Sequence, residues 1–244
     1  MPLKSRVALI SGSTYGIGKA IAQKFVEDGW TVVQNSKNPI SNAELIGAKH
    51  FIADVTNLAE CKSLVESVLS EFGQIDALIC NTGSGVDTGD ELSKMQRWDH
   101  FLRINLNSAS NLISAALNAL KESKGSVTAI SSICAIVTIA GAPIEYSGAK
   151  AALNAYIKSL AIKHGPEGVR FNIVAPGNVL FGGSTWDHKL INSREATLAY
   201  ITKNVPMNGF VDPKEVAAAV AFLASQESSS TTGAVLVIDR GQSL

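Results

Sequence analysis

The sequence predicts a single α/β domain in which about seven strands form a doubly wound parallel sheet with helices on both faces. Short apolar runs recur along the chain, and most are apolar throughout rather than alternating, as expected for strands covered on both faces. Helical patterns lie between these runs. Repeated strand–helix–strand units imply right-handed crossovers, which produce a parallel sheet.

The expected strands are separated by stretches that can hold a helix or a turn. They cover residues 7–11, 31–33, 50–53, 77–80, 126–130, 170–174 and 234–238. After the first strand, Ile17, Ile21 and Phe25 repeat at helical spacing, and Gly29 follows where a C-terminal cap is expected. Residues 142–168 also have a helical pattern. Because no linker or repeat interrupts this order, residues 1–244 are predicted to form one domain.

The longest stretch without a clear strand covers residues 177–212. It contains two adjacent glycines, Gly182 and Gly183, followed by Trp186. A loop–helix excursion of this length is typical of a lid or a binding element. We therefore predict that residues 177–212 form a substrate-binding lid within the domain.

Charge and composition favour a small-molecule partner or a protein recognised locally. Lysines and arginines number 21, as do the acidic residues, so no basic surplus suggests nucleic acid or an anionic membrane. The three cysteines lie far apart and the four histidines show no metal-ligand spacing, so we expect no metal site and no disulfide framework. No apolar run is long enough for a signal sequence or a membrane span, which predicts a soluble, cytoplasmic protein.

A glycine-rich turn, "SGSTYGIG" at residues 11–18, follows the first strand directly. Backbone N–H groups and a helix N-terminus there can approach a pyrophosphate, because Gly12, Gly16 and Gly18 have no Cβ. This order of elements is typical of Rossmann-like dinucleotide-binding domains, although three glycines can also make only a tight connection. The second strand ends in Ser36 and Lys37 without an acid, which favours NADP(H) over NAD(H) unless Lys37 is simply a solvated charge.

Tyr146 and Lys150 lie one helical turn apart and therefore face the same side of the expected helix. A positive charge near a phenol favours the phenolate and so lowers the tyrosine pKa. Ser131 and Ser132 end a predicted strand at the sheet edge where ligands bind in such folds. A serine hydroxyl there can hold a carbonyl oxygen while Tyr146 gives or takes a proton.

Taken together, these segments resemble the short-chain dehydrogenase/reductase family over essentially the whole chain. The glycine turn is similar to its T-G-x-x-x-G-x-G motif, and the likeness includes members that act as 3-oxoacyl-(acyl-carrier-protein) reductases. The other matching segments are "ADV" (53–55), "CNTG" (80–83), "RINL" (103–106), "YSGAK" (146–150), "APGNV" (175–179) and the C-terminal "DPKEVAAAVAFLAS" and "TGAVLVIDRG".

The resemblance implies hydride exchange between a nicotinamide and a carbonyl or alcohol carbon. By this likeness, Tyr146 is the acid/base and Lys150 lowers its pKa and holds the nicotinamide ribose. Ser132 binds the substrate oxygen, with Ser131 as the alternative, and Asn105 supports a water that relays protons. The implied cofactor-binding residues are Gly12, Ser13, Thr14, Gly16, Ile17, Gly18, Ser36, Lys37, Asp54, Val55, Asn81, Gly83, Pro176 and Gly177. The family also implies a homotetramer or dimer.

Several positions depart from the family pattern. Cys80 and Thr82 replace an asparagine and an alanine, Phe181 stands near the place of a threonine that contacts the nicotinamide, and Arg240 occupies a glycine position. The stretch between Lys37 and Asp54 is too short for the full helix that the family has between its second and third strands.

The leading hypothesis is an NADP(H)-dependent reductase of a ketone such as a 3-oxoacyl thioester. An NAD-dependent alcohol or dihydrodiol dehydrogenase is the alternative within the enzyme class. A nucleotide-binding protein without turnover is the alternative outside it, although such a protein would need none of Asn105, Ser132, Tyr146 and Lys150. We expect the substrate pocket to draw on Cys134, Ile136, Ala142 and Glu145, together with Phe181 and Trp186 of the lid.

Overall fold

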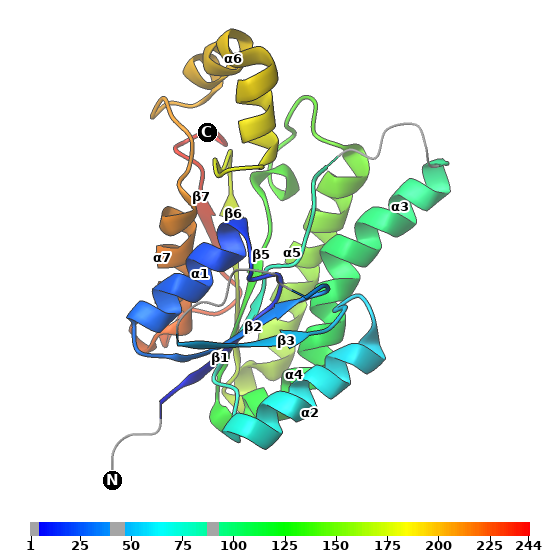
Figure 1. The fold of residues 1–244 in the computed structure, drawn as a ribbon, viewed down its shortest axis with the longest axis vertical. Helices are drawn as coiled ribbons and strands as arrows, with labels where there is room; N and C mark the ends of the chain where they lie inside the picture. The colour runs from blue at the N-terminus through cyan, green and yellow to red at the C-terminus, as the bar shows by residue number, and fades with distance from the viewer. Residues whose placement is uncertain (1–4, 40–46, 87–92) are drawn as a thin grey trace.

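A computed structural model describes residues 5–39, 47–86 and 93–244 and shows one parallel sheet between two layers of helices (Figure 1). Within these residues the sheet has seven strands in the order β3-β2-β1-β4-β5-β6-β7, and every neighbouring pair is parallel. The predicted fold class is therefore confirmed. The strands are β1 (Val7–Ile10), β2 (Thr31–Ser36), β3 (Ala48–Ile52), β4 (Ala77–Cys80), β5 (Ser126–Ile130), β6 (Arg170–Pro176) and β7 (Val235–Ile238).

The two helical layers bury different sides of the same strands. Helices α1 (Gly16–Glu27) and α7 (Pro213–Ala224) pack together on one face, while α2 (Leu58–Phe72), α4 (Ser108–Ser123) and α5 (Ile144–His164) cover the other. Leu9 belongs to the core under α4, whereas its neighbour Ile10 belongs to the core under α1. Successive side chains of a strand point to opposite faces, so both must be apolar when both faces are covered.

Local sequence signals explain where several helices begin and end. The Asn57 side chain accepts hydrogen bonds from the N–H groups of Ala59 and Glu60 at the start of α2. Asp212 and Glu215 form a capping box at the start of α7. Helix α3 (Lys94–Leu102) continues through a π-helical turn at Arg103–Asn107 into α4. A π-helical turn inserts one residue into the helix and is frequent at functional sites.

The structure refines the predicted boundaries. Strand β2 runs three residues beyond the expected 31–33 and therefore includes Ser36, and β6 extends to Pro176. The first helix ends at Glu27, and Gly29 follows with a φ of 78°. Residues 40–46, in the short connection between Lys37 and Asp54, lie outside the described residues.

The sheet topology places the predicted site at one edge. Strand β1 has β2 on one side and β4 on the other, so the connections leave it in opposite directions and open a crevice beyond its carboxyl end. The glycine turn follows β1, Asn81 follows β4 and Ser131 follows β5 at this edge. Helix α6 (Thr185–Asn204), drawn in yellow, stands over it near the C-terminus (Figure 1). None of the helices in the described part of the chain is long and apolar enough to cross a membrane.

Candidate active site

Two residues of the glycine turn adopt left-handed backbone conformations that favour glycine, and a third leaves no room for a Cβ. Gly12 and Gly16 have φ values of 58° and 54°, and a Cβ on Gly18 would lie 2.2 Å from the carbonyl oxygen of Gly12. The Asn81 amide donates to that same oxygen at 2.9 Å, and the Ser11 hydroxyl accepts from the Asn81 N–H at 3.0 Å. Asn81 and Ser11 thus fix the turn despite the unusual residues on either side of Asn81.

At the ends of β2 and β3 the predicted adenosine-binding residues form an ion pair. The Nζ of Lys37 lies 2.9 Å from Oδ2 of Asp54. Partial burial raises the pKa of Asp54, but hydrogen bonds from Lys37 and Thr56 outweigh this effect and lower the pKa to about 2. The Ser36 hydroxyl lies 2.8 Å from Nε2 of His50. The positive charge of Lys37 is therefore matched by a carboxylate just beyond the end of the neighbouring strand β3.

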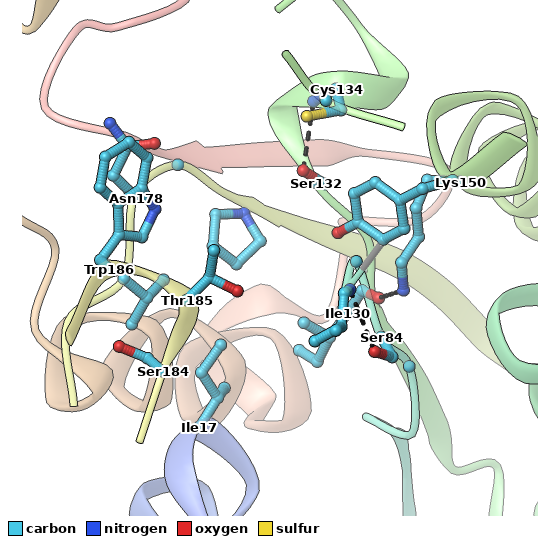
Figure 2. A pocket seen from close by; sticks show the side chains of 18 of the residues that line it. Ile17, Ser84, Ile130, Ser132, Cys134, Lys150, Asn178, Ser184, Thr185 and Trp186 are labelled. Atoms are coloured by element: carbon cyan, nitrogen blue, oxygen red, sulfur yellow. Dashed lines mark hydrogen bonds between the residues drawn. The ribbon is translucent and has the colours of Figure 1, made fainter. Parts of the chain in front are cut away.

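Tyr146 and Lys150 lie one turn apart on α5 and both line the same cavity. Lys150 is buried, and its Nζ lies 5.9 Å from the Tyr146 ring centroid and donates to the carbonyl oxygen of Ile130 at 2.8 Å (Figure 2). Burial lowers the pKa of Lys150 to about 8. Burial also raises the pKa of Tyr146 to about 12, although the nearby Ser132 hydroxyl acts in the opposite direction.

This shift corrects one expectation from the sequence. The positive charge of Lys150 was expected to lower the Tyr146 pKa, but the removal of the phenol from water dominates. Tyr146 is therefore a protonated phenol at neutral pH. A protonated phenol can donate a proton. It must first lose that proton to a base before it can accept one.

The two candidate serines differ in their surroundings. Ser132 lies close enough to Tyr146 to oppose the rise in its pKa, and the Ser132 hydroxyl accepts from the N–H of Cys134 at 3.2 Å. Ser131 is also buried in the cavity wall, but its hydroxyl has no hydrogen-bond partner among the described residues. This geometry puts Ser132, rather than Ser131, next to the Tyr146 hydroxyl.

Asn105 supports the cavity from behind. It lies in the π-helical turn, and its side chain donates to the carbonyl oxygen of Ser84 and accepts from the Ser84 N–H, both at 3.0 Å. A Cβ on Gly83 would lie 2.8 Å from Oδ1 of Asn105 and 2.8 Å from Nζ of Lys150. The two side chains therefore face each other across a position where only glycine fits.

A cavity of about 610 Å³ gathers part of the predicted site. Figure 2 shows Ser132 and Lys150 on one side of it and Asn178 and Trp186 on the other. Ten predicted residues line this cavity: Gly12, Ile17, Gly18, Asn81, Gly83, Ser132, Tyr146, Lys150, Pro176 and Gly177. Eight do not: Ser13, Thr14, Gly16, Ser36, Lys37, Asp54, Val55 and Asn105.

Of the residues predicted to line the substrate pocket, some line the cavity and others do not. Cys134, Ala142, Phe181 and Trp186 line the cavity as expected. Ile136 does not line it, and Glu145 is bound instead by the Arg97 guanidinium at 3.2 Å. Sequence reasoning missed Tyr15, Ser84, Asn178, Lys189 and Tyr200, which also line the cavity. The position of Asn178 next to Pro176–Gly177 was the signal available, whereas Lys189 and Tyr200 reach the cavity only because α6 folds over it.

The Phe181 side chain packs against the glycine turn. Its ring lies 5.3 Å from that of Tyr15 in an edge-to-face arrangement, and a Cβ on Gly16 would lie 2.6 Å from it. The aromatic pair therefore packs the segment before α6 against the glycine turn.

The donor set fits a dinucleotide. The Ser131 hydroxyl and the Asn178 side-chain amide are buried polar groups without partners in the described residues, and both line the cavity beside the glycine turn. Buried polar groups ordinarily find a partner, so these two are available to hydrogen-bond a ligand in the cavity. Across the described ranges, no cluster of three or more His, Cys, Asp or Glu could hold a metal ion.

Comparison with known proteins decides the family. The family model described as enoyl-(acyl carrier protein) reductase matches residues 12–243. The chain belongs to the short-chain dehydrogenase/reductase family. The chain is similar to glucose 1-dehydrogenase 2 of Bacillus subtilis, with 33% identity over 254 residues, which cover 99% of this chain and 96% of that one. It is also 33% identical to the 3-oxoacyl-(acyl-carrier-protein) reductase FabG of Salmonella typhimurium over 247 residues, 99% of this chain and 98% of the other.

A solved structure similar to this chain has the same fold. The ligand-free aldohexose dehydrogenase of Thermoplasma acidophilum is 29% identical with a TM-score of 0.89, over 99% of this chain and 95% of the other. As a member of the short-chain dehydrogenase/reductase family, the protein is an NAD(P)-dependent oxidoreductase. Its relatives include enzymes named for sugars and enzymes named for 3-oxoacyl groups.

Proposed function

We propose that this short-chain dehydrogenase/reductase uses NADP(H) to reduce a ketone, most suitably a 3-oxoacyl thioester. The observation that carries the proposal is the apolar lining of the cavity next to the reacting residues. Beside Tyr146 and Ser132 the wall is formed by apolar or small residues, namely Ile133, Cys134, Ile139, Ala140, Ala142 and Pro143. A sugar needs polar groups for each of its hydroxyls, whereas an acyl chain is bound by apolar contact.

The proposed chemistry assigns proton handling to the protein. A bound nicotinamide would supply the hydride. The Ser132 hydroxyl would hold the substrate carbonyl oxygen, and Tyr146 would donate a proton to that oxygen. The high pKa of Tyr146 keeps it protonated for this step. The Lys150 ammonium would stabilise the phenolate that remains, and Asn105 would hold the Ser84 segment that closes the cavity behind Lys150.

The end of β2 supports NADP(H) as the cofactor. Ser36 and Lys37 stand there without an acid that could bind a ribose 2′-hydroxyl. The Asp54 carboxylate is occupied by Lys37 and Thr56. The exposed Lys37 ammonium has further hydrogens with which to bind a 2′-phosphate.

One observation favours an NAD-dependent alcohol or dihydrodiol dehydrogenase as the second candidate. Because Asp54 neutralises Lys37, a 2′-phosphate at this place would meet no net positive charge from the pair. The two candidates therefore differ in whether Lys37 contributes to cofactor binding.

Titration of the purified protein with NADPH and with NADH, followed by nicotinamide fluorescence, tests this proposal. In a Lys37→Ala variant, NADPH affinity should fall about tenfold while NADH affinity stays unchanged, since only the phosphate contact is lost. Equal binding of both cofactors by the two proteins supports the NAD-dependent candidate. Turnover of a 3-oxoacyl thioester, glucose and a secondary alcohol with each cofactor then identifies the substrate class. A protein that binds neither cofactor would refute both candidates.

We also propose that the chain acts in the cytoplasm as a homo-oligomer. Ile144 and Ile162 of α5 are 78% and 82% exposed, which leaves apolar surface for a second copy. The three cysteines, all within the described residues, carry free thiols, which suits a reducing compartment. Light scattering of the purified protein measures the number of copies.

A further inference from the structure

We propose that Lys189 and the Tyr200 hydroxyl form a subsite for an anionic group on the substrate. This inference rests on the proposed function, because it names the class of carbonyl compound that the same cavity takes. The anionic group is either a carboxylate of the substrate itself or a phosphate of the carrier arm in a thioester. Both present oxyanions at a distance from the reacting carbonyl.

The subsite is organised around Trp186. Helix α6 carries Trp186, Lys189 and Tyr200, and all three line the cavity. The Lys189 ammonium lies 4.4 Å from the Trp186 ring centroid, and the Tyr200 ring is stacked on the same indole with centroids 5.5 Å apart. A cation over an indole is held by the quadrupole of the ring. Lys189 and Tyr200 therefore both contact the Trp186 indole.

The two halves of α6 are fixed relative to each other. The helix bends at Ser193, whose φ and ψ are −155° and 60°. The buried Thr197 hydroxyl donates across the bend to the carbonyl oxygens of Lys189 and Ser193 at 3.1 and 2.8 Å. Lys189 precedes the bend and Tyr200 follows it, so this bridge sets how the two polar groups lie around Trp186.

The Tyr200 hydroxyl can still act as a donor. Its phenolic oxygen accepts a hydrogen bond from the Gln242 side chain at 3.2 Å. The phenolic hydrogen is thus available to an acceptor in the cavity, since a tyrosine hydroxyl both accepts and donates. An ammonium together with a hydroxyl donor is a suitable pair for an oxyanion.

The charges that line the cavity favour an anionic ligand. Among the described lining residues none is Asp or Glu, and the two cations are Lys150 and Lys189. The nearby carboxylates are engaged elsewhere: Asp187 accepts from the Gly183 N–H at 2.6 Å, and Glu145 is bound by Arg97. No ion pair among the described residues involves Lys189. Trp186 lies across the cavity from Lys150 (Figure 2), so the second cation meets the substrate at the end opposite the chemistry.

Binding measurements test the subsite without requiring turnover. Hexanoate and its methyl ester are titrated calorimetrically into the enzyme with cofactor added, using wild type, Lys189→Met and Lys203→Met. Lys203 is an exposed lysine on α6 that does not line the cavity, so its variant controls for the loss of one charge. Lys189→Met should weaken hexanoate binding about tenfold and leave methyl hexanoate and the Lys203→Met variant unchanged. Equal binding of acid and ester by wild type, or equal loss in both variants, overturns the subsite.

Steady-state kinetics distinguish a carboxylate of the substrate from a phosphate of the carrier arm. They also test the subsite separately from the proposed function. The substrates are a 3-oxo acid, its methyl ester, a 3-oxoacyl coenzyme A thioester and the same thioester on N-acetylcysteamine, which lacks phosphate. With Lys189→Met, KM should rise about tenfold for the carboxylate or for the coenzyme A thioester while kcat is kept, because the lost contact is remote from the reacting carbon. Turnover of the neutral esters with no effect of Lys189→Met on any substrate would refute the subsite and leave the proposed function intact. Absence of turnover with every substrate would refute the proposed function, and the calorimetry would still decide the subsite.

Discussion

Gly83 separates Asn105 from Lys150, because a Cβ on this glycine would lie 2.8 Å from a polar atom of each. Such a distance is shorter than real Cβ contacts allow, so one of the two buried side chains would have to move. Both belong to the predicted site, and both are held by backbone carbonyl oxygens. The space at residue 83 is therefore tied directly to the position of the Lys150 ammonium.

Replacement of Gly83 should damage activity more than folding. We expect Gly83→Ala to displace the Lys150 ammonium and to lower kcat/KM about 100-fold, since small misplacements at a reacting site have effects of this size. Gly165→Ala is the matched control, because a Cβ there meets nothing within 4 Å. Steady-state kinetics and thermal unfolding of both variants provide the measurement. Wild-type kcat/KM in Gly83→Ala would show that Lys150 need not stay where it is.

Removal of the Tyr146 hydroxyl should stop the reaction and spare cofactor binding. A general acid contributes about 10²- to 10⁴-fold to a rate, so Tyr146→Phe should lose activity in that range. The ring would keep its edge-to-face contact with Phe101, whose centroid lies 6.3 Å away. Stopped-flow hydride transfer and nicotinamide fluorescence test the two parts. A rate within tenfold of wild type would assign the proton to another group.

The lowered pKa of Lys150 predicts how stability depends on pH. Between its folded value of about 8 and its ordinary value of 10.5, the unfolded chain binds more protons than the native one, so this group makes the protein more stable as pH rises. Wild type should therefore gain stability relative to Lys150→Met between pH 8 and pH 10.5. Urea unfolding of both proteins at several pH values measures the difference. A constant difference across this range would mean that the Lys150 pKa is unshifted.

Replacement of Arg240 tests the effect of an arginine at a position where the family has glycine. It adopts a φ of 57°, and its guanidinium binds both carboxylate oxygens of Glu215 at 2.9 and 3.0 Å. Arg240→Gly relieves the left-handed backbone but loses an exposed ion pair, so the free energy of unfolding should change by less than about 1 kcal/mol. Glu215→Ala also loses the capping box of α7 and should cost about 1 kcal/mol or more. Urea unfolding decides the order, and a larger loss in Arg240→Gly would contradict it.

The sequence by itself determined the fold class, because its signals are local. The apolar run at residues 77–80 matches β4 to the residue, since strands covered on both faces are mostly apolar along their length, and residues 126–130 match β5 although they include Ser126 and Thr128. The glycine turn and the Tyr146–Lys150 spacing were likewise visible, since each depends on backbone conformation over a few residues. The C-terminal end of β2 shows the limit of such signals: Ser36 is in the strand although only residues 31–33 were expected.

Only the tertiary structure decided which charges meet. Asp54 pairs with Lys37, and Glu145 turns to Arg97 instead of the cavity, because contacts between separate elements depend on strand order and helix packing. The Tyr146 pKa rises because the fold removes the phenol from water, an effect that spacing along the helix cannot reveal. Lys189 and Tyr200 enter the cavity because α6 bends at Ser193 and stands over the sheet edge. Burial and long-range contact are properties of the folded chain as a whole, and they set the electrostatics of this site.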